Sequence, residues 1–361
     1  MECPSKEQAT LASAVRLGLT PAFGTRRFRQ YLDAGGDLAE AGRGDAKVLR
    51  TRLRMDPPTA RRLARALRQN DPQRELSAAA RAGIVVSPWG GPGYPGAFRE
   101  LADPPPVVYR RGAFEDDEGE VRVAVMGTRR ATTYGERIAR TLGADLARAG
   151  VSVLAGFGRG IDTAAHEGAL SAGGRCVGVL ASGLLEPYPP EGLEMLERVA
   201  QTGAVFSEFP LRVGARPEHF PKRNRLLAAL SLAVVVVEAG ERSGVMSLVR
   251  HALDLGREVL AVPGPVDRES SRGTLRLLRE GATPIGSSRD LFEALGWCRG
   301  GPADLPKEER AVLEALAPGP AASAKVAVEC SLTEECAAGL LLTLEVRGLV
   351  ARQPDGHYEL R

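Results

Sequence analysis

The chain has 361 residues, which is long enough for two or three domains. Hydrophobic residues make up 43% of it and charged residues 26%, values that are typical of a soluble globular protein and exclude a disordered or fibrous one. The net charge of +3 is too small to indicate a nucleic-acid partner by itself, although the two ends of the chain differ in sign.

The N-terminal residues lack the basic start and apolar run of a signal peptide. The longest apolar stretch, Leu226–Val237, is shorter than the roughly 20 residues that a membrane span needs. We therefore expect a cytoplasmic protein with no membrane partner. The cysteines are odd in number and form no Cys-x-x-Cys pair, so we expect buried thiols rather than disulfides or a zinc site. They are Cys3, Cys176, Cys298, Cys330 and Cys336.

The first 76 residues predict a small domain of short helices. Leu63, Ala66 and Leu67 recur at helical spacing, and Pro57-Pro58 stands at the expected start of that helix. Residues 43–68 contain eight Arg and one Lys against two Asp. These helices could assist nucleic-acid binding, or their arginines could reflect a chain that uses 43 Arg and only five Lys, and the sequence leaves both interpretations open.

A stretch rich in Pro and Gly, residues 88–106, leads into the main domain, which we place at residues 77–298. Six short segments in it are apolar throughout, which is typical of parallel strands that helices cover on both faces. We predict an α/β fold: an extended Rossmann-like, doubly wound and mostly parallel sheet. The expected strands are 121–126, 151–155, 176–181, 204–207, 233–238 and 258–262.

The composition changes after Gly300-Gly301-Pro302, and the remaining pattern predicts a winged-helix domain at residues 305–361. Three helical segments precede a hairpin whose turn is Pro354-Asp355-Gly356. The segments are 307–316, 323–329 and 334–346. Phosphates would be repelled by Glu334 and Glu335 on the third helix, so we expect this domain to contact a protein or to regulate.

Polar or Gly-rich turns follow several of the expected strands. Ligands of open parallel sheets lie beyond the carboxyl ends of the strands, where the N-termini of helices favour anions. The turns are Gly127-Thr128-Arg129-Arg130, Gly156-Phe157-Gly158-Arg159-Gly160 and Ser243-Gly244, and Phe220–Arg225 opens the helix after the fourth strand. We therefore expect one continuous groove that binds a nucleic-acid backbone.

Three cations fall within one expected helical turn that begins at Pro221: Lys222, Arg223 and Arg225. Cations at a helix N-terminus oppose the helix dipole by about 0.3 to 1 kcal/mol each, and a bound phosphate would balance them. The alternative is an internal ion pair with one of three glutamates, Glu208, Glu218 or Glu238. Phe220 could stack on a base or act as a hydrophobic staple.

Neither catalysis nor a cofactor is indicated. A dinucleotide site at Gly156-x-Gly158-x-Gly160 would need an acidic residue about 20 positions on, where Ala181-Ser182-Gly183 stands instead. These glycines either let phosphates approach the backbone or form a structural turn, and Asp162 is either a helix cap or a ligand. The histidines at 166, 219, 251 and 357 show neither triad nor metal-ligand spacing, so we expect no catalytic residue, metal or cofactor.

Seven motifs, taken in order, resemble the DNA-processing protein A (DprA, Smf) family of bacteria. They are Val125–Gly135, Gly160–His166, Tyr188-Pro189, Ser207–Pro210, Phe220–Arg225, Glu238–Gly244 and Val262–Gly264. The likeness covers about residues 84–295. The flanking regions resemble, less specifically, the sterile-alpha-motif-like (SAM-like) and winged-helix additions of that family.

The resemblance implies a non-enzymatic homodimer that binds single-stranded DNA without sequence preference. It further implies that the protein protects incoming DNA and loads the RecA recombinase onto it during natural transformation. The residues that it places in the phosphate site are Arg129, Lys222, Arg223, Asn224 and Arg225, with Gly158, Phe220, Ser243 and Gly244 at the wall.

This chain departs from the family at two places. Ala155-Gly156 replaces a usual Ser-Gly, and Val245–Leu248 replaces a usual Ser-Leu-x-Thr. The alternative function is a Rossmann-fold nucleotide phosphoribohydrolase-like enzyme. The resemblance to such enzymes would require a Pro-Gly-Gly-x-Gly-Thr turn with a nearby Glu, and the corresponding segment Glu238–Gly244 lacks that turn.

Overall fold

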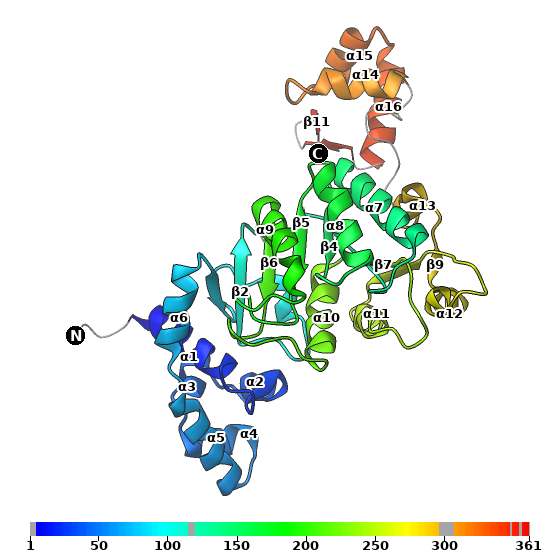
Figure 1. The fold of residues 1–361 in the computed structure, drawn as a ribbon. Helices are drawn as coiled ribbons and strands as arrows, with labels where there is room; N and C mark the ends of the chain where they lie inside the picture. Colours follow the sequence, from blue (N-terminus) through cyan, green and yellow to red (C-terminus); the bar gives the residue numbers. More distant parts are fainter. Residues whose placement is uncertain (1–4, 115–119, 296–306, 347–348, 354–355, 361) are drawn as a thin grey trace. The chain divides into compact units, whose positions relative to one another are not determined.

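The computed structural model describes residues 5–114, 120–295, 307–346, 349–353 and 356–360. It divides into two compact units, Met1–Gly286 and Ser287–Arg361 (Figure 1). Cys3, Cys298, the Gly300–Pro302 segment and the hairpin turn at Pro354-Asp355 lie outside the described residues. The division of the chain into three domains stays a prediction.

The N-terminal region folds into short helices, and acidic or hydroxyl side chains at the residue before several of them accept hydrogen bonds from the first turn. Ser5, Asp37, Asp45, Asp56 and Asp71 act in this way. The helices are α1 (Lys6–Gly18), α2 (Gly24–Asp33), α3 (Leu38–Gly42), α4 (Ala46–Leu53), α5 (Pro57–Gln69) and α6 (Pro72–Arg81).

These helices are tied to the main domain by specific contacts. The rings of Phe28 in α2 and Trp89 meet edge to face, with their centroids 6.1 Å apart. Glu75 in α6 accepts a hydrogen bond of 2.6 Å from the backbone N–H of Leu211.

The main domain is built on a sheet of nine described strands, in the order β1-β2-β6-β5-β4-β3-β7-β8-β9. The strands from β6 to β9 in this order are parallel, whereas β2 pairs antiparallel with β6 and β1 pairs antiparallel with β2. The strands are β1 (Val85–Pro88), β2 (Val107–Gly112), β3 (Arg122–Met126), β4 (Ser152–Ala155), β5 (Cys176–Val179), β6 (Ala204–Ser207), β7 (Ala233–Val236), β8 (Glu258–Ala261) and β9 (Thr283–Pro284). All six expected strands are confirmed, as is the mostly parallel Rossmann-like sheet.

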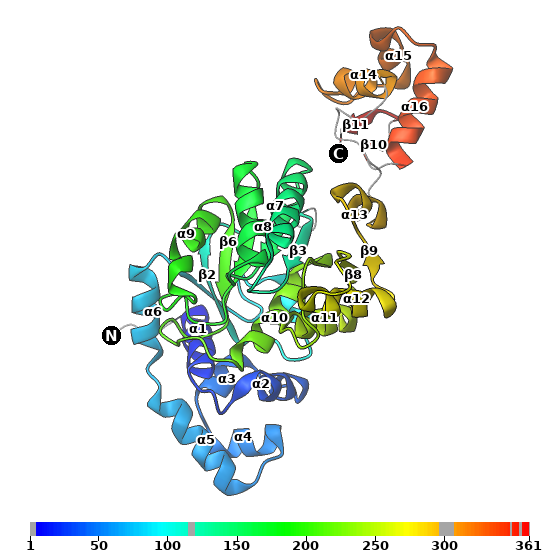
Figure 2. The same cartoon turned by 45° about the vertical axis from the view of Figure 1, so that its right-hand side comes forward.

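Helices cover the sheet on both faces. Crossovers between parallel strands are right-handed, so the helix lies on one face when the chain moves one way along the sheet and on the other face when it moves back. The chain moves from β3 to β6 through α7 (Thr133–Arg148), α8 (Ile161–Ser171) and α9 (Leu193–Thr202). It then crosses back through α10 (His219–Leu230) and continues through α11 (Val245–Asp254) and α12 (Arg272–Arg279). Figures 1 and 2 show α7, α8 and α9 side by side, with α10 and α11 in a separate layer.

The core explains why the parallel strands are mostly apolar. Ala124 and Met126 of the central strand β3 pack into a cluster with Leu226–Leu230 of α10 and with Leu248 of α11. Val123 and Val125 alternate with them and are also fully buried. Both faces of the sheet are therefore excluded from water.

The second unit has the winged-helix arrangement. The last three of its described helices and an antiparallel pair of strands surround a core that includes Val312, Val326, Leu341 and Tyr358, and α13 precedes them. The elements are α13 (Ser288–Ala294), α14 (Lys307–Leu316), α15 (Ser323–Cys330), α16 (Glu334–Val346), β10 (Val350–Arg352) and β11 (Tyr358–Leu360). The expected helices at 307–316 and 334–346 are confirmed to the residue.

Candidate nucleic-acid interface

The main domain has a topological switch point at β3. The sheet extends from β3 through β4, β5 and β6 on one side and through β7, β8 and β9 on the other. In open α/β sheets, ligands bind beyond the carboxyl ends of the strands at this position. A hollow of about 350 Å³ lies there, which we call the switch-point groove. Its lining comes from the turns after β3, β4 and β7 and from the first turns of α10.

The fold brings most of the expected site residues together at this groove. Seven line it: Arg129, Gly158, Phe220, Arg223, Asn224, Ser243 and Gly244. Lys222 is exposed but does not line it, and Arg225 is buried elsewhere. The sequence missed other lining residues, among them Met126 and Val245, whose apolar side chains carry no signal of a binding site.

A cation and an aromatic ring, Arg129 and Phe220, form one wall of the groove, and Tyr188 lies beside them. The guanidinium carbon of Arg129 lies 4.2 Å from the centroid of the Phe220 ring and 6.0 Å from that of Tyr188. The two rings meet edge to face, with centroids 6.1 Å apart. Arg129 is exposed and has no ion-pair partner among the residues that the structure describes. A planar cation stacked on a partly exposed ring can meet both a phosphate and a base.

A buried cation and a buried carboxylate, Arg223 and Asp162, form the floor. Arg223 is only 6% exposed, and its Nη1 donates to the carbonyl oxygen of Val179 at 2.9 Å. Burial lowers the pKa of Arg223 to about 10, although the carboxylate of Asp162 opposes that effect. Burial likewise raises the pKa of Asp162 to about 6, against the attraction of Arg223. The two side chains thus partly neutralise each other beneath the more exposed Arg129.

The glycines of the turn after β4 make room for this pair. A Cβ atom at Gly156 would lie 2.1 Å from Nη1 of Arg223, and one at Gly158 would lie 3.1 Å from Oδ2 of Asp162. The backbone N–H of Gly158 donates to the same oxygen at 3.3 Å. Of the two roles considered for these glycines, Gly156 therefore serves the internal structure. Asp162 is the second residue of α8, and the residue before the helix is Gly160.

Asn224 holds the opposite wall in place. Its Nδ2 donates to the carbonyl oxygen of Gly244 at 3.1 Å and to the hydroxyl of Ser247 at 2.7 Å, while its Oδ1 accepts from Nε of Arg223 at 3.0 Å. An added Cβ at Gly244 would meet no protein atom within 4 Å, so space stays open there. Asn224 therefore joins the floor of the groove to the turn after β7.

Arg225 takes the alternative that the sequence left open, an internal ion pair. Its Nη2 pairs with the carboxylate of Glu208, and its Nε lies 3.5 Å from Oδ1 of Asp103. The side chains of Arg225 and Glu208 are 4% and 6% exposed. Glu238 has a different role, since both of its oxygens accept hydrogen bonds from Thr132 at the start of α7.

The expected start of α10 is wrong by two residues. The helix begins at His219, so Pro221 is its third residue rather than its first. Successive helical residues point about 100° apart, so three neighbouring cations separate. Lys222 is exposed, Arg223 enters the floor of the groove, and Arg225 reaches Glu208.

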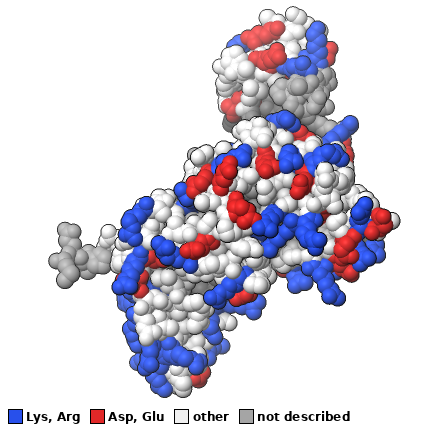
Figure 3. All heavy atoms as spheres, viewed as in Figure 1, with Lys and Arg blue, Asp and Glu red and all other residues white. Residues whose placement is uncertain are grey.

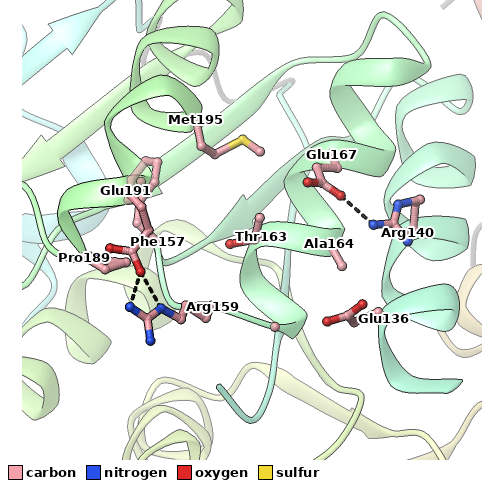
Figure 4. Close-up of a pocket in the computed structure, with 12 residues that line it drawn as sticks. Glu136, Arg140, Phe157, Arg159, Thr163, Ala164, Glu167, Pro189, Glu191 and Met195 are labelled. Atoms are coloured by element: carbon pink, nitrogen blue, oxygen red, sulfur yellow. Dashed lines mark hydrogen bonds and ion pairs between the residues drawn. The ribbon is translucent and has the colours of Figure 1, made fainter. Parts of the chain in front are cut away.

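Arg159, in the turn between β4 and α8, lines a second hollow of about 310 Å³. Figure 4 shows its guanidinium against the carboxylate of Glu191, and Arg140 against Glu167, at 2.5 Å between Nη2 and Oε2. Glu136 also lines this hollow. Its cations are balanced by carboxylates, so it is a poorer anion site than the switch-point groove.

The histidines show no catalytic arrangement in the described residues. His166 is fully buried, and burial lowers its pKa to about 4. His219 stacks on Phe209 at 4.2 Å between ring centroids, and its Nδ1 lies 3.2 Å from the carbonyl oxygen of Ala181. No cluster of three His, Cys, Asp or Glu able to hold a metal occurs within the described ranges. None of the helices there combines the length and apolar composition that crossing a bilayer requires.

The Asp162 carboxyl should make the affinity of the groove for a polyanion depend on pH. As the pH falls through about 6, Asp162 loses its negative charge, and the groove becomes more positive. We expect affinity for a single-stranded oligonucleotide to rise a few-fold between about pH 7.5 and pH 5, and Asp162→Asn to abolish most of this rise. Fluorescence anisotropy at constant ionic strength would measure both. His219 also gains charge at low pH, so an equal rise in Asp162→Asn would assign the effect to His219 instead.

The raised pKa of Asp162 also makes the stability of the protein depend on pH. The folded state holds the Asp162 proton more tightly than the unfolded chain does, so its contribution to the free energy of unfolding declines as the pH rises from about 4 to 6.

Comparisons with known proteins agree with this geometry. Residues 86–296 match the family model of DNA recombination-mediator protein A, and residues 300–356 match that of the DprA winged helix domain. A DprA-named protein of Mycobacterium tuberculosis is 41% identical over 275 residues, which cover 73% of this chain and 70% of that protein. The DNA processing protein DprA of Bacillus subtilis is 34% identical over 222 residues, covering 62% and 75%.

This chain is also similar to solved structures of DNA processing protein A. The X-ray structure of DNA processing protein A from Streptococcus pneumoniae superposes with a TM-score of 0.66 at 26% identity, covering 81% of this chain and 98% of that chain. A DNA processing protein A structure from Helicobacter pylori, described for its single-stranded DNA binding mode, gives a TM-score of 0.52 at 29% identity, covering 59% and 95%.

Proposed function

Because the chain belongs to the DNA recombination-mediator protein A family, we propose that it binds single-stranded DNA in the switch-point groove without sequence preference. The observation that carries the proposal is the stack of Arg129 on Phe220 above Arg223, at the carboxyl edge of the parallel strands. Single-strand binders combine such cations for the backbone with aromatic rings for the bases. The relative from Helicobacter pylori, with its described single-stranded DNA binding mode, supports the same ligand.

The site residues in this proposal differ in their roles. Arg129 and Lys222 are exposed and contact phosphates, whereas Arg223 supplies charge from the floor. Phe220 stacks on a base, and Gly158, Ser243 and Gly244 let the backbone of the strand approach. Asn224 positions the wall, and Arg225 stabilises the fold beneath α10.

We propose a binding role rather than catalysis. In the segment where a phosphoribohydrolase-like enzyme would place its Gly-rich turn, the carboxylate of Glu238 is engaged by Thr132. Among the described residues, no histidine lines the switch-point groove. A second function is therefore not favoured by the geometry.

Salt-titrated binding of oligonucleotides tests the function. Oligo-dT, oligo-dC and a mixed strand of equal length should bind with affinities within about threefold of one another, because phosphates and stacking carry the contact. The logarithm of affinity should fall linearly with the logarithm of salt concentration, by about 0.7 for each phosphate neutralised. An affinity that varies more than tenfold between the strands, or that ignores salt, would contradict the proposal.

We extend the proposal to what the family implies: a homodimer that protects incoming DNA and loads RecA onto it in natural transformation. On a strand coated with single-strand-binding protein, this protein should shorten the lag before DNA-dependent ATP hydrolysis by RecA. The Arg129→Ala variant should not. Equal lags with and without the protein would separate DNA binding from RecA loading and refute the latter.

A further inference from the structure

The helices α4 and α5 carry a second concentration of positive charge that the switch-point groove does not use. Eight cations of residues 43–68 are exposed: Arg43, Lys47, Arg50, Arg54, Arg61, Arg62, Arg65 and Arg68. We call this surface the basic face. Figure 3 shows Lys and Arg gathered at this end of the helical region with few Asp or Glu among them.

The acidic residues of the segment, Asp45 and Asp56, form no ion pair with the basic face among the described residues. Asp45 accepts the backbone N–H groups of Lys47 and Val48 at 2.7 and 3.2 Å, and Asp56 accepts that of Thr59 at 2.9 Å. Both carboxylates are therefore helix caps. Within the described residues the one ion pair of this segment joins Arg52, which is not part of the basic face, to Glu40.

The cations repel one another in the free protein. In α5, Arg61 and Arg65 are four residues apart and Arg65 and Arg68 are three apart, and like charges at these spacings destabilise a helix. A surface that concentrates like charge with few counter-charges lowers stability, and binding a polyanion would remove that cost. The charge pattern therefore indicates an anionic partner.

The helices present these cations from a fixed scaffold. Leu49 in α4 and Leu63 and Leu67 in α5 are buried, so the opposite sides of both helices face solvent. The two helices are joined closely, because Gly44 has a φ of +64° and a Cβ there would lie 3.1 Å from the carbonyl oxygen of Ala64. Nη1 of Arg68 also donates to the carbonyl oxygen of Gly44 at 2.7 Å.

The basic face lacks the second component of a single-strand site. Residues 43–68 contain no Phe, Tyr or Trp, whereas the switch-point groove has Phe220 beside Tyr188. Phosphate contacts alone suit paired DNA, whose bases are already stacked and whose backbone is stiff. We propose that the basic face of α4 and α5 binds the backbone of double-stranded DNA. The basic face would hold a duplex segment while the switch-point groove holds a single strand. This joint arrangement rests on the proposed function of the groove.

The test compares two charge-matched triple variants of the full chain. One carries Arg54→Ala, Arg61→Ala and Arg65→Ala on the basic face. The control replaces three exposed arginines elsewhere, none with an ion-pair partner among the described residues: Arg250, Arg268 and Arg279. The probes are a labelled duplex of about 30 base pairs and oligo-dT, each titrated over salt.

We expect the basic-face variant to bind the duplex at least about tenfold more weakly, and its salt slope to fall by about 0.9 for each phosphate that it no longer neutralises. Its affinity for oligo-dT should change less than twofold, and the control should bind both probes normally. Restoring the charge with Lys at the three positions should restore duplex binding, and thermal unfolding confirms that each variant folds.

Other results overturn the inference. Unchanged duplex binding, or an equal loss in the control, removes the role of the basic face. An equal loss for oligo-dT makes the face part of the single-strand site. Lost binding to phosphatidylserine vesicles with normal duplex binding assigns it to a membrane. If wild-type protein fails to bind oligo-dT yet the duplex results hold, the proposed function fails and this inference stands.

Discussion

Replacing Arg129 and Phe220 together with Ala should weaken binding to oligo-dT by about a hundredfold or more and leave the protein folded. Stacking of a base on an aromatic ring contributes about 1 to 3 kcal/mol, and a hydrogen bond to a charged group about 1.5 to 3 kcal/mol. Each 1.4 kcal/mol is a tenfold change in affinity. Arg129 is exposed and Phe220 is partly exposed at the groove, so their removal leaves no buried charge behind.

The matched control is Arg159→Ala. Arg159 is also an exposed arginine after a parallel strand, but Glu191 already pairs with it. Its removal should change oligo-dT affinity less than threefold. A strand of abasic sites separates the two contributions of the double variant, because Phe220→Ala should not affect it whereas Arg129→Ala should. If the double variant bound oligo-dT as tightly as the wild type, the single-stranded site would lie elsewhere.

Much of the fold could be predicted because burial on both faces imposes a strong pattern. The segments of β3 to β8 are short and apolar, and each turn that follows a parallel strand reaches the same edge of the sheet. The two-residue strand β9 is too short to show a pattern, and the strands β1 and β2 could not be predicted for another physical reason. Val85–Pro88 is half exposed and ends in Pro, and Val107–Gly112 ends in two arginines and a glycine, so neither has the pattern of a buried strand.

The side-chain partners of the site could be predicted less well, because they come from distant parts of the chain. Spacing alone placed Lys222, Arg223 and Arg225 in one cluster. Where each of these cations points depends on how α10 is oriented about its own axis. Their partners depend on which acidic side chains the fold places beside each face of α10. Asp162 reaches Arg223 from α8, whereas Glu208 reaches Arg225 from the loop after β6. The sequence indicated Glu208 as a candidate acid but offered no means to choose it over Glu238.

The largest loss of stability should follow Arg225→Ala. Glu208 would remain buried without its partner, and removal of one member of a buried ion pair typically costs about 3 to 5 kcal/mol. Burial already raises the pKa of Glu208, and the charge of Arg225 opposes that rise. The variant should therefore lower the urea midpoint of the main domain strongly, and the pKa of Glu208 should be higher in it than in the wild type.

A double variant distinguishes a structural role for Arg225 from a role in binding. Arg225→Met with Glu208→Leu removes both charges at similar volume, and such replacements are often neutral or stabilising, so most of the lost stability should return. Because Arg225 does not line the switch-point groove, the refolded double variant should bind oligo-dT within about threefold of the wild type. Recovered stability with binding still lost would place Arg225 among the DNA-binding residues, since the fold would then no longer account for the loss.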